Sequence, residues 1–311
     1  MRQFVIFEKF NLFRRLTNTF DPTKFALFAG GNTGASDVTT TTRYFYSNDS
    51  INSGQSLSNR RSEYAAAGNS TRAILAAGKV NDFLSPTSVK YTYATNVFAN
   101  GGSLQTARKL LAATGNSTRG IFQQGVVTTN PGTTANDKYT YSNDTRAAAV
   151  SLGSPARHAF AAAGDASFGI FCGGYDGTSY VSTSNKYTYS NDSVSSAAAL
   201  QVARGFLAAA GNSTKGIFGG GIENGSVNSY VTEKFTYADN TTATSTNLSI
   251  ARASLGATGN TTTGVFTGGD TGSPSSVTDK YNYTTDNVIP GTSLNTATKS
   301  LAGCSSVPGG F

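Results

Sequence analysis

The sequence predicts an all-β protein in which one structural unit is repeated six times. Two observations support this prediction. A string similar to GNSTRGIF returns at nearly constant intervals, and a tyrosine-rich string similar to YTYSND returns with it. In addition, Gly, Ser, Thr, Asn and Ala dominate the composition along all 311 residues, without a change that would mark a second domain. A fixed period of this length is typical of a repeat architecture.

The elements of the repeat have the signals of short strands. The first string begins at residues 68, 115, 164, 211 and 259, and a shorter copy, ALFAGG, begins at residue 26. The tyrosine string begins at residues 44, 91, 139, 187, 235 and 281. Apolar runs rich in Phe, Tyr, Ile and Val, bounded by Gly, Asn and Asp, predict strands, and no helical spacing of apolar residues persists beyond residue 20.

Each unit contains four such elements in a constant order. In residues 200–247 an alanine-rich strand is followed by Gly-Asn, a glycine-rich strand, a variable loop, the strand EKFTY and a Thr/Ser-rich return. Gly-Asn and the later Asn-Asp supply the positive φ angles and side-chain hydrogen bonds that tight turns need. We therefore predict four-stranded antiparallel sheets joined by hairpins.

The two ends of the chain are expected to meet in one sheet. The alanine-rich element has its last copy, LNTATKSLAGC, at the C-terminal end, whereas the first unit begins directly with its glycine-rich strand. Pairing of Ser300–Cys304 beside Phe25–Gly30 would complete that unit and remove both open sheet edges. The predicted fold is thus a six-bladed β-propeller over residues 23–311, closed by its N- and C-terminal strands.

The motifs resemble the kelch repeat over residues 23–304: an Arg before an apolar strand, then a strand ending in Gly-Gly, then a Tyr-containing strand. The Gly-Gly pairs are read as Gly30-Gly31, Gly173-Gly174, Gly219-Gly220 and Gly268-Gly269, while Ala77-Gly78 and Gln124-Gly125 depart from the pattern. The family's Trp is missing, so Phe and Tyr are expected to fill the space between blades. The resemblance implies a binding scaffold without catalytic activity.

No group of residues predicts catalysis, a metal site or a cofactor. The copper oxidases that share this fold use two His, and the Asp-box of propeller sialidases contains Trp, but this chain has one His, His158, and no Trp. Cys172 and Cys304 lie in different units and are expected to be free, buried thiols. We therefore expect that the protein is not an enzyme.

Basic residues recur with the repeat and account for most of the net charge of +7. One series precedes the tyrosine strands and contains Arg43, Lys90, Lys138, Lys186, Lys234 and Lys280. A second precedes the alanine-rich strands and contains Arg61, Arg108, Arg157, Arg204, Arg252 and Lys299. These rings either form an anion-binding face or pair with carbonyls and with carboxylates such as Asp49, Asp144 and Asp192. No motif indicates specific nucleic-acid binding.

Asparagines in glycosylation sequons recur at the predicted hairpin turns. They include Asn69, Asn116, Asn143, Asn191, Asn212, Asn240 and Asn260. Because Asn favours tight turns, the turn geometry explains their repetition without any attached sugar.

Residues 1–22 match no part of the repeat and are predicted to be a docking arm. Their apolar and basic side chains form a candidate partner-binding site made of Phe4, Ile6, Phe7, Phe10, Leu12, Phe13, Arg14, Arg15 and Leu16. The apolar runs are too short for a secretory signal or a membrane span. The arm could dock on its own propeller or on a neighbouring subunit; a membrane surface is a third, weaker alternative.

Two classes of function agree with these features. The first is a structural component of an assembly, for which a tailed-phage virion is the leading candidate because similar Thr/Ser/Asn/Gly-rich repeats occur in phage and bacterial surface proteins. The second is a lectin or adhesin, at a bacterial cell surface or attaching to a host, that binds glycan through five variable loops: Val80–Ser88, Val126–Asp137, Tyr175–Asn185, Ile222–Glu233 and Asp270–Asp279. These loops share no repeated Asp, Asn or aromatic pattern, which argues against six equal sugar sites.

Overall fold

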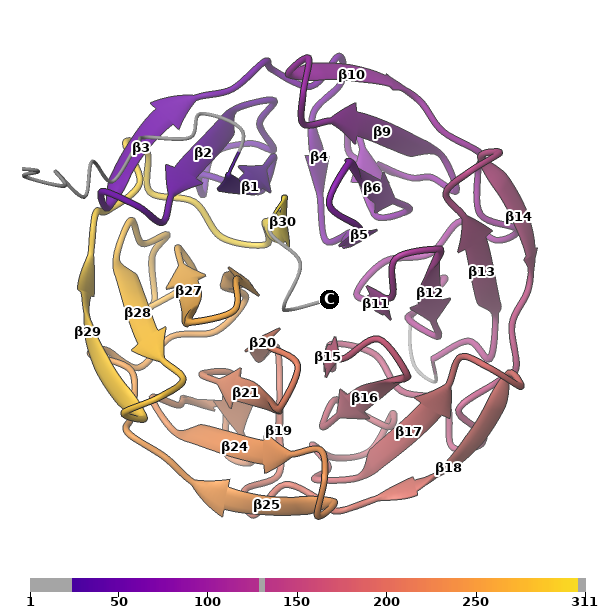
Figure 1. The fold of residues 1–311 in the computed structure, drawn as a ribbon, viewed down its shortest axis with the longest axis vertical. Helices are drawn as coiled ribbons and strands as arrows, with labels where there is room; N and C mark the ends of the chain where they lie inside the picture. Colours follow the sequence, from indigo (N-terminus) through magenta and orange to yellow (C-terminus); the bar gives the residue numbers. More distant parts are fainter. Residues whose placement is uncertain (1–23, 129–131, 307–311) are drawn as a thin grey trace, which may run out of the picture.

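The computed structural model describes residues 24–128 and 132–306, and in these residues every regular element is a β-strand. The strands form six four-stranded and two three-stranded antiparallel sheets. Figure 1 shows the four-stranded sheets placed side by side around a central axis, in a propeller-like arrangement. The prediction of an all-β fold is confirmed. Among the described residues there is no helix of the length and hydropathy needed to cross a bilayer.

The four-stranded sheets are numbered 1 to 6 in chain order, and their strands are given from the axis outward. Sheet 1 contains β30 (Ala302–Ser305), β1 (Phe25–Ala29), β2 (Thr41–Phe45) and β3 (Ser50–Ser53). Sheet 2 contains β5 (Ala65–Gly68), β6 (Arg72–Ala76), β9 (Ser88–Thr92) and β10 (Val97–Asn100). Sheet 3 contains β11 (Ala112–Gly115), β12 (Arg119–Gln123), β13 (Asn136–Thr140) and β14 (Thr145–Ala148).

The remaining four-stranded sheets repeat this order. Sheet 4 contains β15 (Ala161–Gly164), β16 (Phe168–Cys172), β17 (Ser184–Thr188) and β18 (Ser193–Ala197). Sheet 5 contains β20 (Ala208–Gly211), β21 (Lys215–Gly219), β24 (Thr232–Thr236) and β25 (Thr241–Thr244). Sheet 6 contains β26 (Gly256–Gly259), β27 (Thr263–Thr267), β28 (Thr278–Asn282) and β29 (Asn287–Gly291).

Two of the variable loops contain strands that the sequence analysis did not predict. Next to sheet 2, β4 (Arg61–Ser62) pairs with β7 (Lys79–Val80), which forms a hairpin with β8 (Phe83–Leu84). Next to sheet 5, β19 (Arg204–Gly205) pairs with β22 (Ile222–Glu223), which forms a hairpin with β23 (Val227–Asn228). In both cases the hairpin pairs with the short strand that precedes the innermost strand of the sheet.

The predicted meeting of the chain ends is confirmed. Strand β1 pairs antiparallel with β30, with Leu27 opposite Cys304 and Ala29 opposite Ala302. The innermost strand of sheet 1 therefore comes from the C-terminal end and the other three from the N-terminal end. This pairing gives β1 a neighbour on each side, so both of its edges are hydrogen-bonded.

A closed ring of main-chain hydrogen bonds joins the sheets around the axis. The Leu110 amide donates to the Glu63 carbonyl at 2.9 Å, the Ala159 amide donates to the Leu110 carbonyl at 2.8 Å, and the same bond continues from unit to unit until the Glu63 amide donates to the Ser300 carbonyl. All six members have a φ between 53° and 57°: Glu63, Leu110, Ala159, Phe206, Ser254 and Ser300. Each member lies just before an innermost strand, so all six innermost strands start on the same side of the molecule.

The glycine pairs require one correction. The fifth pair is Gly220-Gly221, with φ angles of 69° and 107°, whereas Gly219 is the last residue of β21. Three consecutive glycines made this register ambiguous in the sequence. A Cβ on Gly221 would lie 2.6 Å from the Gly205 carbonyl oxygen, so only glycine fits there. In the unit of sheet 2, Ala77 replaces the first glycine of the pair and adopts the same left-handed conformation, with a φ of 63°. The turn is therefore kept although this unit departs from the Gly-Gly pattern.

Aromatic and branched side chains fill the space between neighbouring sheets, as predicted. Between sheets 2 and 3, for example, Ile74 packs with Phe122 and Tyr139, and all three are completely buried. Equivalent clusters recur around the ring. A buried side chain of this size contributes roughly 1.5–3 kcal/mol through the hydrophobic effect, so these clusters hold the sheets together without Trp.

Candidate binding surfaces

The first series of basic residues joins each sheet to the next. Lys90 of sheet 2 forms an ion pair with Asp144 in the turn that follows the tyrosine strand of sheet 3. The same pair is formed by Lys138 with Asp192, by Lys234 with Asp286 and by Lys280 with Asp49. Carboxylate pairing, the alternative to an anion-binding ring, is therefore what the structure shows for four of the six members.

The acidic partner occupies a turn position that the backbone restricts to few residue types. All six equivalents have a left-handed φ between 51° and 56°: Asp49, Asn96, Asp144, Asp192, Asn240 and Asp286. Asn and Asp tolerate this conformation better than most other residues. The backbone thus explains why only Asn or Asp occurs here, and another cause must select between them.

The neighbouring sheet supplies that cause. Asp144 also receives Arg72, whose guanidinium nitrogen lies 3.5 Å from the carboxylate, so this Asp has two cations. Arg119 and Lys215 add the second cation at Asp192 and Asp286. Burial alone would raise the pKa of Asp144, but hydrogen bonds from Lys90 and Tyr139 lower the pKa below its usual value.

Where the turn residue is Asn, the neighbouring sheet has an aromatic residue in place of the second cation. Phe168 takes that place in sheet 4, and the ammonium of Lys186 lies 5.5 Å from its ring centre. In sheet 1 the guanidinium of Arg43 lies 5.6 Å from the ring of Phe25. A cation over an aromatic face needs no carboxylate, so the change from Asp to Asn leaves these two cations stabilised.

The second basic series is buried inside the sheets. Arg108 pairs with Asp137 at 2.8 Å, and both side chains have no solvent exposure. Arg204 with Glu233 and Arg252 with Asp279 form equivalent buried pairs. Each arginine also donates to a carbonyl oxygen of the adjacent strand. These cations are therefore part of the core and are not available to an anionic partner.

The remaining members of this series use other acceptors. Arg157 donates to the carbonyls of Gly173 and Thr183, both at 2.7 Å, and to the side chain of Asn185. Arg61 likewise donates to two carbonyls, and burial lowers its pKa to about 10. Lys299 forms an ion pair with Asp270 at 2.6 Å. Arg61 and Arg157 thus bond to main-chain carbonyls. The sequence analysis gave this arrangement, together with carboxylate pairing, as the alternative to an anion-binding face.

The sequon asparagines act in turns, as predicted. The side-chain oxygen of Asn116 accepts hydrogen bonds from the amides of Thr118 and Arg119, at 2.9 and 3.1 Å. The same arrangement recurs at Asn69, Asn212 and Asn260. These turns and the Asn/Asp turns lie at the opposite end of the strands from the variable loops, and we call this side of the molecule the turn face.

The other side, which we call the loop face, contains the variable loops and the closed hydrogen-bond ring. Three large apolar side chains on it are well exposed: Phe83 (77%), Val227 (63%) and Tyr230 (52%). Phe83 and Val227 belong to the hairpins β7–β8 and β22–β23, next to sheets that lie on opposite sides of the axis (Figure 1). The sequence analysis missed these residues because exposure depends on how the hairpins fold back.

An aromatic cluster lies beside the axis on the loop face. The rings of Tyr175 and Tyr180 have centres 5.3 Å apart, and Tyr180 lies 6.4 Å from Phe206. His158 packs against Tyr175 at 5.4 Å and is 7% exposed. Burial and then the charge of Lys109 lower the pKa of His158. Both ring pairs meet nearly edge to face, at 69° and 78°, and all three rings are partly exposed, so the cluster is a packed aromatic contact at the loop face.

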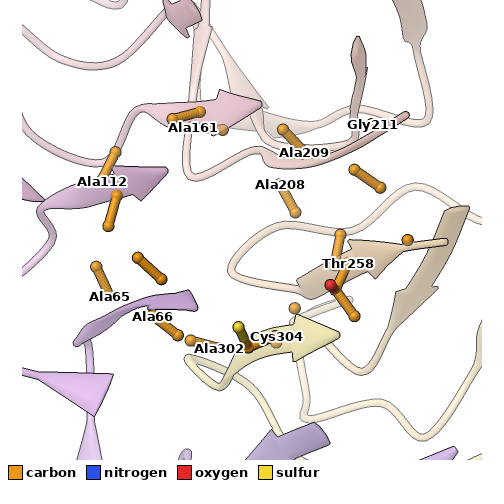
Figure 2. Close-up of a pocket in the computed structure, with 18 of the residues that line it drawn as sticks. Ala65, Ala66, Ala112, Ala161, Ala208, Ala209, Gly211, Thr258, Ala302 and Cys304 are labelled. Atoms are coloured by element: carbon orange, nitrogen blue, oxygen red, sulfur yellow. The ribbon is translucent and has the colours of Figure 1, made fainter. Parts of the chain in front are cut away.

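The central axis is hollow and lined by small residues. A cavity of about 130 Å³ is bounded by the six innermost strands. Figure 2 shows Ala66, Ala112, Ala161, Ala209 and Ala302 around it. A second cavity of about 90 Å³ lies at the loop-face end, where Glu63 is the acidic residue of its lining. Glu63 forms ion pairs with Lys79 and Lys109 at 2.8 and 2.7 Å, so its charge is already compensated.

The cysteines have the predicted state. Cys172 and Cys304 are free and buried. Burial raises the pKa of Cys172 to about 12 and that of Cys304 to about 11, so both remain protonated thiols. Within the described ranges, no group of three or more His, Cys, Asp and Glu side chains is arranged to hold a metal ion.

The predicted docking residues of the arm lie outside the described part of the chain. This applies to all nine: Phe4, Ile6, Phe7, Phe10, Leu12, Phe13, Arg14, Arg15 and Leu16. Their role stays a prediction, as does the boundary of the arm at residue 22.

No family model matches the chain, and no curated protein matches it at a significant level. A function must therefore be inferred from the chain's own surfaces.

Proposed function

We propose that the protein is a non-catalytic structural and interaction protein built as a six-bladed, kelch-like β-propeller. In this proposal the six four-stranded sheets are the blades, the loop face binds a partner, and the arm of residues 1–22 anchors the disk to neighbouring subunits. We further propose that the assembly is the virion of a tailed phage, with the protein in its tail or associated with its capsid.

The apolar exposure of the loop face is the observation that carries this proposal. Phe83, Val227 and Tyr230 are each more than half exposed there. Single exposed apolar side chains are common, but two protruding hairpins with apolar residues, next to an aromatic cluster, favour contact with another protein. Many charged side chains of the strands, by contrast, are used in ion pairs within and between the sheets.

The virion assignment depends on resemblance. The near-identical Thr/Ser/Asn/Gly-rich repeats are similar to repeats of phage and bacterial surface proteins, and 13% charged residues is a low content. The aromatic and basic residues of the arm are suited to docking on another subunit. These features support a structural component more than a free enzyme or receptor.

The first test compares the solution mass of the full chain with that of a chain starting at Pro22. The described residues, 24–128 and 132–306, contain the strand pairs of all six four-stranded sheets, so we expect the shortened chain to retain the fold. We expect the full chain to associate and the shortened chain to be a monomer. The double variant Phe7→Ser/Phe10→Ser in the full chain should also be a monomer. A monomeric full chain would contradict the anchoring role of the arm.

The loop face is tested separately by cross-linking the full chain within purified virions of the phage that encodes it. Phe83→Ser/Val227→Ser should reduce its incorporation, whereas Val97→Ser, which changes an exposed residue on an outermost strand, should not. Absence of the protein from the purified particles would exclude the virion assignment and leave the interaction proposal to be tested elsewhere.

The aromatic cluster favours a second function, a carbohydrate-binding adhesin. Tyr175, Tyr180 and Phe206 are partly exposed aromatic side chains that are grouped on the loop face, where they are available to contact a sugar. A glycan array with the full chain tests this proposal. Binding that is lost in Tyr180→Ala but retained in Val97→Ser would support the adhesin, and absence of binding to any glycan would reject it.

A further inference from the structure

Four of the junctions between neighbouring sheets have an Asp at the turn position, and one of these four has fewer charged side chains than the others. It is the junction between sheet 6 and sheet 1, where the ring closes. Lys280 pairs with Asp49 here at 2.6 Å, like its counterparts. The position that supplies a second cation elsewhere is occupied by Thr263, opposite Asn282 in the strand register. Within the part of the chain that the structure describes, this junction therefore has one cation and one carboxylate.

The chain contains three copies of the arrangement that holds a second cation. In the junction of sheets 2 and 3, Arg72 donates to the Tyr141 carbonyl at 2.6 Å and lies 3.5 Å from the Asp144 carboxylate. The two other copies consist of these donor, carbonyl and carboxylate residues: Arg119, Tyr189 and Asp192; and Lys215, Tyr283 and Asp286. A main-chain carbonyl and a carboxylate thus form a recurring acceptor pair for a cationic side chain.

A cavity of about 120 Å³ lies at the corresponding place between sheets 6 and 1. Its lining consists of Tyr44, Tyr46, Thr263, Lys280, Asn282 and Ile289. Tyr46 corresponds to Tyr141 in the register, and Thr263 corresponds to Arg72. Ile289 is 53% exposed, so the cavity is accessible from the outer edge of the molecule. Thr263 thus has a short side chain at the place where the three copies have a long cationic one. At the junction of sheets 2 and 3 a cavity of about 190 Å³ remains beside Arg72 and Tyr141, but its other lining residues differ from those between sheets 6 and 1.

We propose that this cavity binds the guanidinium group of an arginine side chain presented by another polypeptide. The guanidinium occupies the place that the Arg72 side chain takes in its own junction. It donates to the Tyr46 carbonyl and to the Asp49 carboxylate, while its aliphatic stem lies along Ile289. This binding site is independent of the proposed virion role and of the loop face.

The electrostatics of the other junctions support an additional cation here. Each of the three copies combines two cations with one carboxylate, whereas the closing junction has one of each. Burial opposes ionisation of Asp49, but hydrogen bonds from Lys280, Tyr44 and Thr292 lower its pKa, so the carboxylate is ionised at neutral pH. A guanidinium binds a carboxylate and a carbonyl together better than an ammonium does, because its donors form a planar fork.

The test is an NMR titration of the full chain with N-acetyl-arginine methylamide, followed through the amide signals of residues around the cavity. We expect saturable shifts at Thr263 and Asn282, with a Kd on the order of millimolar because a single untethered group binds weakly. The citrulline analogue, which has the same shape without charge, should cause no saturable shifts. The lysine analogue should bind more weakly than the arginine analogue.

Two variants make the assignment specific. Thr263→Arg fills the cavity from within the chain and should abolish the shifts. Arg72→Thr should create a second site beside Tyr141 and Asp144, with its own saturable shifts. The proposal is overturned if the wild type shows no saturable shifts, or if they persist unchanged in Thr263→Arg. Equal binding of the citrulline analogue would also overturn it, because recognition would then not involve charge.

Discussion

The ion pairs inside the sheets and those between the sheets both join a basic side chain to a carboxylate, but they differ in environment. Inside, the side chains of Arg108 and Asp137 have no exposure. Between sheets, Lys90 and Asp144 keep 22% and 30% of their side-chain exposure. A buried charge that loses its partner is costly, whereas a partly hydrated charge can use water or an aromatic ring instead. This difference predicts unequal responses to the same kind of substitution.

The largest effect is expected inside a sheet. Asp137→Ala leaves the Arg108 guanidinium buried without its carboxylate and should lower the free energy of unfolding by about 3–5 kcal/mol. Chemical denaturation at pH 7 measures the loss. Asp239→Ala, at an exposed turn position, is the matched control and should change stability by less than about 0.5 kcal/mol. Equal effects of the two variants would show that loss of the buried carboxylate costs no more than loss of an exposed one.

A smaller, pH-dependent effect is expected between sheets. In the folded protein the pKa values of Asp144, Asp192 and Asp286 are lowered, so their stabilisation is present above the pKa of the unfolded chain and is lost as the pH falls through the folded pKa. The triple Asp→Asn variant should be less stable at pH 7 by about 1.5 kcal/mol, at about 0.5 kcal/mol per partly exposed site.

The difference between this variant and the wild type should decrease as the pH falls below the ordinary Asp pKa of about 4, and it should disappear below the lowered pKa values of the folded protein, because the wild-type carboxylates are then protonated. Unfolding curves at several pH values check this. A difference that is independent of pH would indicate that the asparagines disturb the turns and that the ion pairs contribute nothing.

The third prediction concerns Arg157, which is buried with carbonyl and amide acceptors only. Asn185→Asp should give it a carboxylate like that of Arg108 and raise the free energy of unfolding by about 1 kcal/mol at pH 7. Thermal unfolding measures the gain. Because Asn185 also donates to the Leu152 carbonyl at 3.4 Å, a decrease in stability would mean that this amide bond outweighs the new ion pair.

The smallest effect is expected at a junction where Asn occupies the turn. In the wild type the ammonium of Lys186 lies over the Phe168 ring. Asn240→Asp places a carboxylate near this ammonium and should stabilise the protein by about 0.3 kcal/mol at low salt. The gain should disappear at high salt, because exposed pairs are screened. If the gain persists in 1 M salt, the new pair is more deeply buried than its counterparts.

The order of strands was predictable because it depends on local signals that recur. The turn after each tyrosine strand needs a residue that accepts positive φ, and the chain supplies Asn or Asp there in every unit. The expectation of positive φ at the Gly-Asn turns was wrong: neither Gly115 nor Asn116, for example, has it, and the Asn side chain acts there through its hydrogen bonds alone. The register was less certain where neighbours are alike: of the three glycines at 219–221, only packing against the Gly205 carbonyl selects the pair that turns. The β7–β8 and β22–β23 hairpins have few residues and weak signals, and they were read as loops.

The ion pairs between sheets illustrate a signal that the sequence contains but that needs the fold to be understood. The turn residues Asn96 and Asn240 come one unit after the glycine-rich strands that begin with Phe25 and Phe168. Asp144 and Asp192 come one unit after the glycine-rich strands that begin with Arg72 and Arg119. These residues are about 70 positions apart, so nothing local relates them. Only the placement of one sheet beside the next shows that they touch.

The sequence by itself determined the repeat, the strand types, the turns and the pairing of the chain ends, because these follow from period, propensity and the need to satisfy sheet edges. The tertiary structure decided which charges are paired and which apolar side chains are exposed. It also decided where cavities lie. Those properties depend on contacts between residues far apart in the chain, and a substitution as small as Thr263 for a long cation changes them without changing the repeat.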